Sequence, residues 1–121
     1  MTAWAQWALH CQGLDRQAPF GYGLEGTRQA IAHLGYVQVD TIHVVERAHH
    51  HVLWSRVPDY QPDFLNTLLA QREVFEHWAH AAAYLPMCDF RFALPRMRRV
   101  REGKHPWFDV DERLLARILA R

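Results

Sequence analysis

The chain has 121 residues, half of them hydrophobic, and its 14 Lys and Arg against 13 Asp and Glu leave a formal net charge of +1 at pH 7. A chain of this length buries roughly 60 to 70% of its unfolded surface, so we expect one compact domain rather than two. Cys11 and Cys88 form no CxxC pair, which argues against a disulfide scaffold and favours a reducing compartment. No apolar run approaches the roughly 20 residues of a membrane span, and residues 1–14 lack the pattern of a signal peptide, so we expect a cytoplasmic protein.

Helical spacing of apolar residues dominates the first half of the chain. It predicts helices near residues 4–11, 24–34 and 45–57, with Gly13, Gly35 and Pro58 as their stops. Trp4 and Trp7 are expected in the core. Between the second and third helices, residues 36–45 are rich in β-branched residues and alternate in polarity, which predicts a strand.

The second half predicts a helix at residues 62–72, a strand at 73–79, a helix from Asp89 that Pro95 interrupts or kinks, and an amphipathic helix at 112–121. Short helices with a few short strands are typical of a helix-rich α+β domain such as a winged helix. We therefore expect a winged-helix domain over residues 1–108. Residues 109–121 would begin a following domain or form a docking helix.

A basic tract stands out against the near-neutral composition. Six Lys and Arg fall within fourteen positions and only two acidic residues oppose them: Arg91, Arg96, Arg98, Arg99, Arg101 and Lys104 against Asp89 and Glu102. Such a patch raises the local concentration of anionic partners, of which nucleic acid is the commonest. A solvated basic face without any partner is an equal alternative.

The triplet His49, His50 and His51 does not predict a metal site. Successive side chains on a helix point about 100° apart, so three neighbours cannot face one ion. His77 and His80 could share a helical face, but no matching Cys or carboxylate completes a zinc site. Hydrogen-bonded structural imidazoles and phosphate-contacting ones both remain open.

Gln38 and Asp40 form a compact amide and carboxylate pair in an apolar stretch. In an extended backbone they point the same way and can hold one water between them. The sequence contains neither a phosphate-binding Gly-rich loop nor a serine nucleophile elbow. By spacing alone, the polar face of an edge strand, or helix capping, explains the pair more simply than catalysis does.

Several longer segments resemble one enzyme family. The segments are LGYVQVDTI at residues 34–42, VERAHHH at 45–51, LWSRVP at 53–58, FEHWAHA at 75–81 and LPM at 85–87. They look like the YcaQ/AlkZ group of bacterial winged-helix DNA glycosylases. The YcaQ-like branch is the nearer one, because its catalytic motif is glutamine, an aliphatic residue and aspartate, as in Gln38, Val39 and Asp40.

The resemblance implies excision of N7-alkylated guanine from double-stranded DNA and unhooking of interstrand crosslinks, without a metal or a nucleotide cofactor. Gln38 would orient the water and Asp40 would be the catalytic carboxylate. It also implies a bacterial, nucleoid-associated location. Relatives of this kind are several times longer and carry tandem winged-helix domains. We therefore expect partners in further such domains, or self-association, through Leu114, Leu115, Ile118 and Leu119.

Charge and position select the residues expected to contact the DNA backbone, namely Arg47, His50, Arg56, Arg96, Arg98 and Arg99. Internal pairing of Arg47 or Arg56 with Glu46 or Asp59 is the structural alternative. Two other functions stay open. One is a winged-helix transcriptional regulator, and the other is an inactive fragment that serves as an interaction domain.

Overall fold

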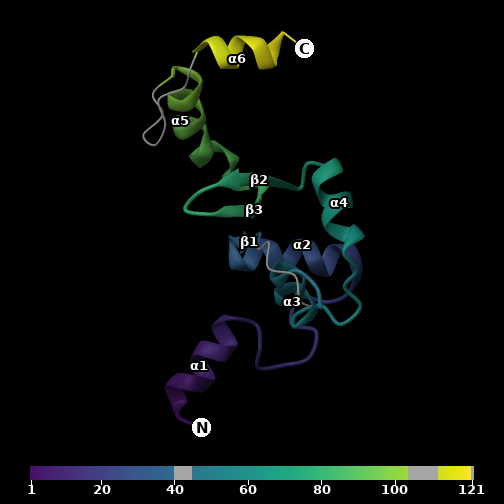
Figure 1. The fold of residues 1–121 in the computed structure, drawn as a ribbon. Coiled ribbons are helices and arrows are strands. Elements are labelled where there is room, and N and C mark those ends of the chain that lie inside the picture. Colours follow the sequence, from purple (N-terminus) through teal and green to yellow (C-terminus); the bar gives the residue numbers. More distant parts are fainter. Residues whose placement is uncertain (40–44, 104–111, 121) are drawn as a thin grey trace. The chain divides into compact units, whose positions relative to one another are not determined.

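The structure is a computed structural model that describes residues 1–39, 45–103 and 112–120. Its elements (Figure 1) are α1 (Ala3–Cys11), α2 (Gly23–Leu34), β1 (Val37–Gln38), α3 (Ala48–Trp54), α4 (Asp63–Ala70), β2 (Val74–Trp78), β3 (Ala82–Pro86), the 3-10 turn η1 (Met87–Asp89), α5 (Phe90–Arg101) and α6 (Glu112–Leu119). The chain divides into two compact units, Met1–Phe90 and Arg91–Arg121. In the part of the chain that the structure describes, no helix is long and apolar enough to span a membrane.

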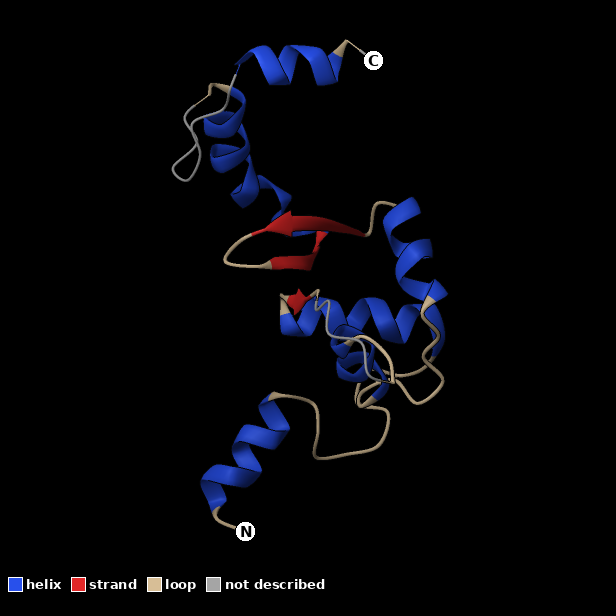
Figure 2. Ribbon diagram, viewed as in Figure 1, coloured by secondary structure: helices blue, strands red, loops and turns tan. Residues whose placement is uncertain are grey.

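The three strands form one antiparallel sheet in the order β1-β3-β2 (Figure 2). The helix predicted at residues 24–34 is α2, and it ends at Gly35, whose φ of 68° is left-handed. A left-handed residue after a helix favours glycine because it has no Cβ to clash. The turn lets the chain enter β1 within two residues, so α2 directly positions the strand that carries Gln38.

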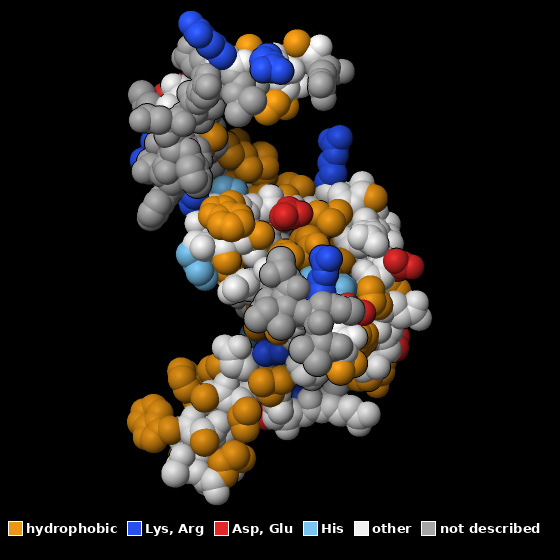
Figure 3. All heavy atoms as spheres, viewed as in Figure 1, with side chains coloured by type: hydrophobic (Ala, Val, Ile, Leu, Met, Phe, Trp, Pro, Cys, Tyr) orange, Lys and Arg blue, Asp and Glu red, His pale blue; other side chains and the backbone are white. Residues whose placement is uncertain are grey.

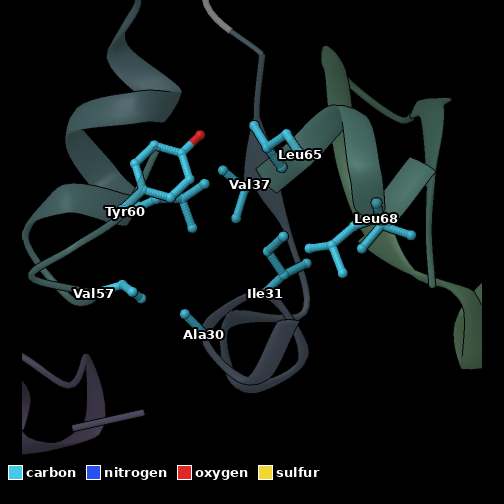
Figure 4. Packing of buried hydrophobic residues seen from close by; sticks show 9 residues of the cluster. Ala30, Ile31, Val37, Val57, Tyr60, Leu65 and Leu68 are labelled. Carbon is cyan, nitrogen blue, oxygen red and sulfur yellow. The ribbon is translucent and has the colours of Figure 1, made fainter. Parts of the chain in front are cut away.

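Apolar side chains from α2, α3, α4 and the sheet meet in one core (Figure 4). Ile31, Leu53 and Leu68 are fully buried, one from each helix, and Val37 adds the inward face of β1. Helix α2 packs against α4 and β3, while α3 packs against β1 and α4 packs against β2. The core therefore holds the short β1 strand between helices and its neighbour β3.

From α2 to β3 the elements follow the order helix, strand, helix, helix, strand, strand. This order, with the small antiparallel sheet, confirms the expected helix-rich α+β, winged-helix-like fold. The strand predicted at residues 73–79 is β2, but β3 was not predicted. Its sequence, AAYLP, is short and rich in alanine, so its strand conformation depends on pairing with β2 and β1. The suggestion that His77 and His80 share a helical face is wrong, because they lie on β2 and in the turn after it.

Helix α1 forms where helical spacing predicts it, but its tryptophans are not in a core. Trp4 is 81% exposed and Trp7 is 63% exposed, and no residue of α1 is buried. Figure 3 shows the hydrophobic side chains of this helix on the molecular surface. Periodicity identifies the apolar side of a helix, but it does not establish that another element covers that side.

Helix α5 begins at Phe90, one residue after the predicted start, and continues through Pro95. The predicted domain boundary after residue 108 lies outside the described residues, as do residues 104–111 as a whole. Helix α6 matches the predicted last helix. Of the four apolar side chains expected to form its docking face, that of Ile118 is described and is 61% exposed, while those of Leu114, Leu115 and Leu119 lie outside the described part. Association through this face stays a prediction.

Candidate functional site

Gln38 lies on β1 and faces away from the core. Its neighbour Val37 is 1% exposed and packs into the core cluster, whereas Gln38 is exposed. Successive side chains of a strand point to opposite faces of the sheet, so burying Val37 turns the carboxamide outward. The other member of the predicted catalytic pair, Asp40, lies outside the described residues.

Strand pairing surrounds Gln38 with a defined set of neighbours. Gln38 is paired with Ala83 of β3, and Ala83 is paired with His77 of β2. These three residues form a row across the sheet on the face that carries the Gln38 carboxamide, in which the exposed glutamine and the half-buried imidazole flank the fully buried Ala83. Adjacent strands lie about 4.8 Å apart, so the backbones of Gln38 and His77 are roughly 10 Å apart.

Two aromatic side chains are connected to the carboxamide. The Tyr36 hydroxyl donates to Gln38 Oε1 at 3.4 Å and lies 3.2 Å from His80 Nε2. The rings of Tyr36 and His80 are stacked, with centroids 5.2 Å apart and an interplanar angle of 20°. Tyr36 lies two residues before Gln38 and therefore on the same face of the extended chain. The β2–β3 turn brings His80 to it.

Sequence reasoning did not assign a role to either Tyr36 or His80. Tyr36 could have been found from the alternation of side chains along a strand, because it lies two residues before Gln38 just as Asp40 lies two residues after it. His80 carried no such signal, because its contact with Tyr36 spans 44 positions and depends on the hairpin of β2 and β3.

The histidine triplet diverges as helical geometry requires. His49 is 3% exposed and lies against Tyr84, His50 Nδ1 is 2.7 Å from the Tyr60 hydroxyl, and the exposed His51 reaches the carbonyl of Glu46. Burial lowers the pKa of His50 and raises that of Tyr60. Within residues 1–39, 45–103 and 112–120, no group of three or more His, Cys, Asp or Glu side chains could hold a metal ion.

Arg56 is built into the fold. It is 7% exposed, and its guanidinium donates to the Gln12 carbonyl at 2.8 Å, the Val52 carbonyl at 2.8 Å and Ser55 Oγ at 3.0 Å. These bonds join the end of α3 to the segment after α1. The predicted DNA contact of Arg56 stays a prediction, but its burial and its bonds leave little of the group for a phosphate.

The other predicted DNA contacts differ in exposure. Arg47 is exposed just before α3, and Arg98 and Arg99 are exposed on the last turns of α5. Arg96 is half-buried and interacts within the protein. His50 is also half-buried and bonded to Tyr60. Arg47, Arg98 and Arg99 are therefore the predicted contacts most open to an anionic partner.

Helix α4 occupies the place of the second helix of a helix-turn-helix, the element that commonly enters the major groove. Its sequence is DFLNTLLA, which contains an exposed Asp63 in the first turn and no Lys or Arg. A helix with this composition is poorly suited to a polyanion. Helix α4 is therefore a poor candidate for reading DNA sequence.

Comparison with known proteins gives one family. The model described as "DNA glycosylase AlkZ-like" matches residues 31–121, which is more than half of the 121-residue chain. The match includes Tyr36, Gln38, Asp40 and His80, and it begins within α2. No solved structure matches the chain.

Proposed function

The chain belongs to the AlkZ-like DNA glycosylase family, and we propose that it removes N7-alkylated guanine from DNA by hydrolysing the N-glycosidic bond. The observation that carries this proposal is the outward-facing Gln38 carboxamide, bonded to the Tyr36 hydroxyl within the matched residues. Unhooking of interstrand crosslinks through N7 of guanine belongs to the same proposal, because it breaks the same bond.

The chemistry suits a site without a strong general acid. Alkylation at N7 makes the guanine cationic and therefore a good leaving group, so the base does not have to be protonated. The enzyme has to stabilise positive charge on the sugar and direct a water to its anomeric carbon. In this proposal Asp40 supplies the negative charge and accepts the proton of the water, and Gln38 orients that water.

Electrostatics sets the scale of the effect. Two unit charges 4 Å apart interact by about 4 kcal/mol at an effective dielectric of 20. If this interaction stabilises the transition state and not the bound substrate, it raises the rate of hydrolysis by roughly a thousandfold. Loss of the Asp40 charge is therefore expected to remove most of the activity.

DNA binding is proposed to use backbone contacts, since an enzyme that removes damage has to accept many sequences. Arg47, Arg98 and Arg99 are the proposed contacts because they are exposed. For Arg56 and His50 we propose structural roles, which their internal hydrogen bonds support. A transcriptional regulator that reads bases through α4 is less well supported, because this helix has no basic residue.

The test is release of 7-methylguanine from methylated duplex DNA under single-turnover conditions. We compare wild type, Asp40→Asn and Gln38→Ala, with Asp63→Asn on the exposed first turn of α4 as the matched control. The first two variants are expected to bind DNA normally and to lose most base release, while the control retains it. Unchanged release by Asp40→Asn would refute the proposed role of its carboxylate.

Crosslink unhooking needs its own substrate. A duplex with a single N7–N7 guanine crosslink is incubated with the same proteins, and separation of the strands is followed on a denaturing gel. Unhooking should depend on Asp40 as base release does. Release from monoadducts without unhooking would restrict the proposal to monoadducts.

A further inference from the structure

We propose that Tyr36 and His80 are positioning residues that set the direction of the Gln38 carboxamide. The inference rests on the proposed role of Gln38, and it assigns a purpose to two side chains outside the Gln38 and Asp40 pair. Its basis is the contact chain from His80 Nε2 to the Tyr36 hydroxyl at 3.2 Å, and from that hydroxyl to Gln38 Oε1 at 3.4 Å.

With Gln38 Oε1 directed at the Tyr36 hydroxyl, as in the structure, only one arrangement forms both bonds. Gln38 Oε1 can only accept, so the single proton of the Tyr36 hydroxyl has to point at it. That proton is then not available to His80, and His80 Nε2 has to donate to the Tyr36 oxygen. The chain therefore runs in one direction, from the imidazole N–H through the hydroxyl to the carboxamide oxygen.

This direction has a consequence for catalysis. With Oε1 engaged by Tyr36, the amide NH2 of Gln38 remains as the group that can donate to the oxygen of a water. The water then directs a proton elsewhere, and in the proposed mechanism this proton goes to Asp40. Without Tyr36 the exposed carboxamide could rotate by 180° and present its oxygen to the water instead.

The fold holds the two rings where this chain requires them. Tyr36 is half-buried between Gly35 and β1, and the imidazole of His80 is stacked on its ring. His80 belongs to the turn that joins β2 to β3, and β3 is the direct partner of β1. In this register the Val39 N–H donates to the Ala82 carbonyl, so the turn lies beyond the far end of β1 from Tyr36, and the Tyr36 side chain reaches His80 by extending along the face that carries Gln38.

A purely structural role would be different in its effects. The Tyr36 and His80 contact could serve only to attach the hairpin turn to β1, in which case its loss would lower stability whether or not Gln38 is present. A positioning role requires that removal of the hydroxyl slows base release only when Gln38 is present. The experiment has to separate these two cases.

We measure single-turnover base release and DNA affinity for Tyr36→Phe, Gln38→Ala and the double variant, with Tyr22→Phe as the control because Tyr22 is a 61% exposed tyrosine. Tyr36→Phe removes the hydroxyl and keeps a ring that stacks on His80. A single neutral hydrogen bond corresponds to a loss of about twofold to tenfold in rate, with unchanged DNA affinity. In the Gln38→Ala background the same change is expected to have no further effect.

His80 provides the second arm. His80→Phe keeps an aromatic ring without a donor and should slow release as Tyr36→Phe does, while His80→Gln offers an amide donor and should recover part of the rate. An equal loss from Tyr36→Phe with and without Gln38 would overturn the inference and leave the proposed function intact. If Gln38→Ala itself released base at the wild-type rate, the proposed role of Gln38 would fail instead.

A measurement that does not depend on activity completes the test. Imidazole 15N chemical shifts of the full chain at pH 8 report which nitrogen of His80 carries the proton. The inferred chain requires protonated Nε2, and Tyr36→Phe should change the side-chain amide shifts of Gln38. Protonation at Nδ1 alone, or unchanged Gln38 shifts, would overturn the inference whatever the rate of base release.

Discussion

Arg56→Ala should destabilise the protein without changing how DNA binds to it. The side chain is 7% exposed, and the change removes three hydrogen bonds from a charged donor, to the Gln12 carbonyl, the Val52 carbonyl and Ser55 Oγ. It also removes a cation from the end of α3, where the helix dipole favours positive charge. Arg56 is thus the clearest case in which a predicted DNA contact and a structural role can be separated.

The magnitude follows from these bonds. A hydrogen bond to a charged group contributes about 1.5 to 3 kcal/mol, and bonds that share one side chain are not additive. Ser55 Oγ still donates to the Val52 carbonyl after the change, and Gln12 is exposed enough for water to reach it. Burial lowers the pKa of Arg56, so desolvation already offsets part of the gain. We therefore expect a loss of about 2 to 3 kcal/mol, at the scale of one such bond.

The assay is urea unfolding followed by circular dichroism, together with the salt dependence of DNA affinity. For a chain of this size 1 kcal/mol corresponds to about 4 °C in Tm, so the Tm should fall by about 8 to 12 °C. Arg56→Lys should recover only part of the loss, because an ammonium lacks the planar fork of the guanidinium. Arg16→Ala, in the exposed loop after α1, is the control for removing one positive charge.

Two results for Arg56→Ala, unchanged stability and a lower salt slope of DNA binding, would refute the structural role of Arg56. If Arg56→Ala unfolds within 0.5 kcal/mol of wild type, which is about the ordinary range of surface substitutions, the buried bonds contribute little. If the same variant also lowers the salt slope of DNA binding by about 0.9, the value for one phosphate contact, Arg56 contacts DNA as the sequence suggests.

Three further expectations concern separate parts of the chain. Arg98→Ala together with Arg99→Ala should weaken binding to all DNA sequences alike and reduce the salt slope by about 2, measured by fluorescence anisotropy; an unaltered slope would exclude both as phosphate contacts. Gly26→Ala should lower the free energy of unfolding in urea by about 1 to 3 kcal/mol, because its new Cβ would lie 2.8 Å from the backbone carbon of Gly21. Equal stability would mean that the loop containing Gly21 moves aside at no cost. Burial lowers the pKa of His50 from its ordinary 6.5, so the unfolded chain takes up the proton first and the stability of the fold decreases as the pH drops below about 6.5. His50→Gln should flatten this part of the curve of stability against pH. An unchanged curve would assign the effect to other groups.

Local sequence pattern determined the elements around the site. The apolar stripe of α2, its Gly35 stop and the alternation of Val37 with Gln38 each depend on residues within a few positions, so they could be read from the chain alone. The same locality explains why β2 and α4 were predicted near their observed bounds. It also explains why the outward direction of Gln38 could be expected before any partner strand was known.

Only the tertiary structure decided which side chains are buried and which meet. Trp4 and Trp7 have a helical spacing but no covering element, while Arg56 looks like a surface charge and is enclosed. The Arg56 bond to Gln12 and the contact of Tyr36 with His80 each join residues 44 positions apart. Periodicity reports the conformation of a segment, whereas such contacts depend on how several segments pack. The sequence by itself therefore determined where Gln38 points, and the packing of the hairpin against β1 decided what holds it there.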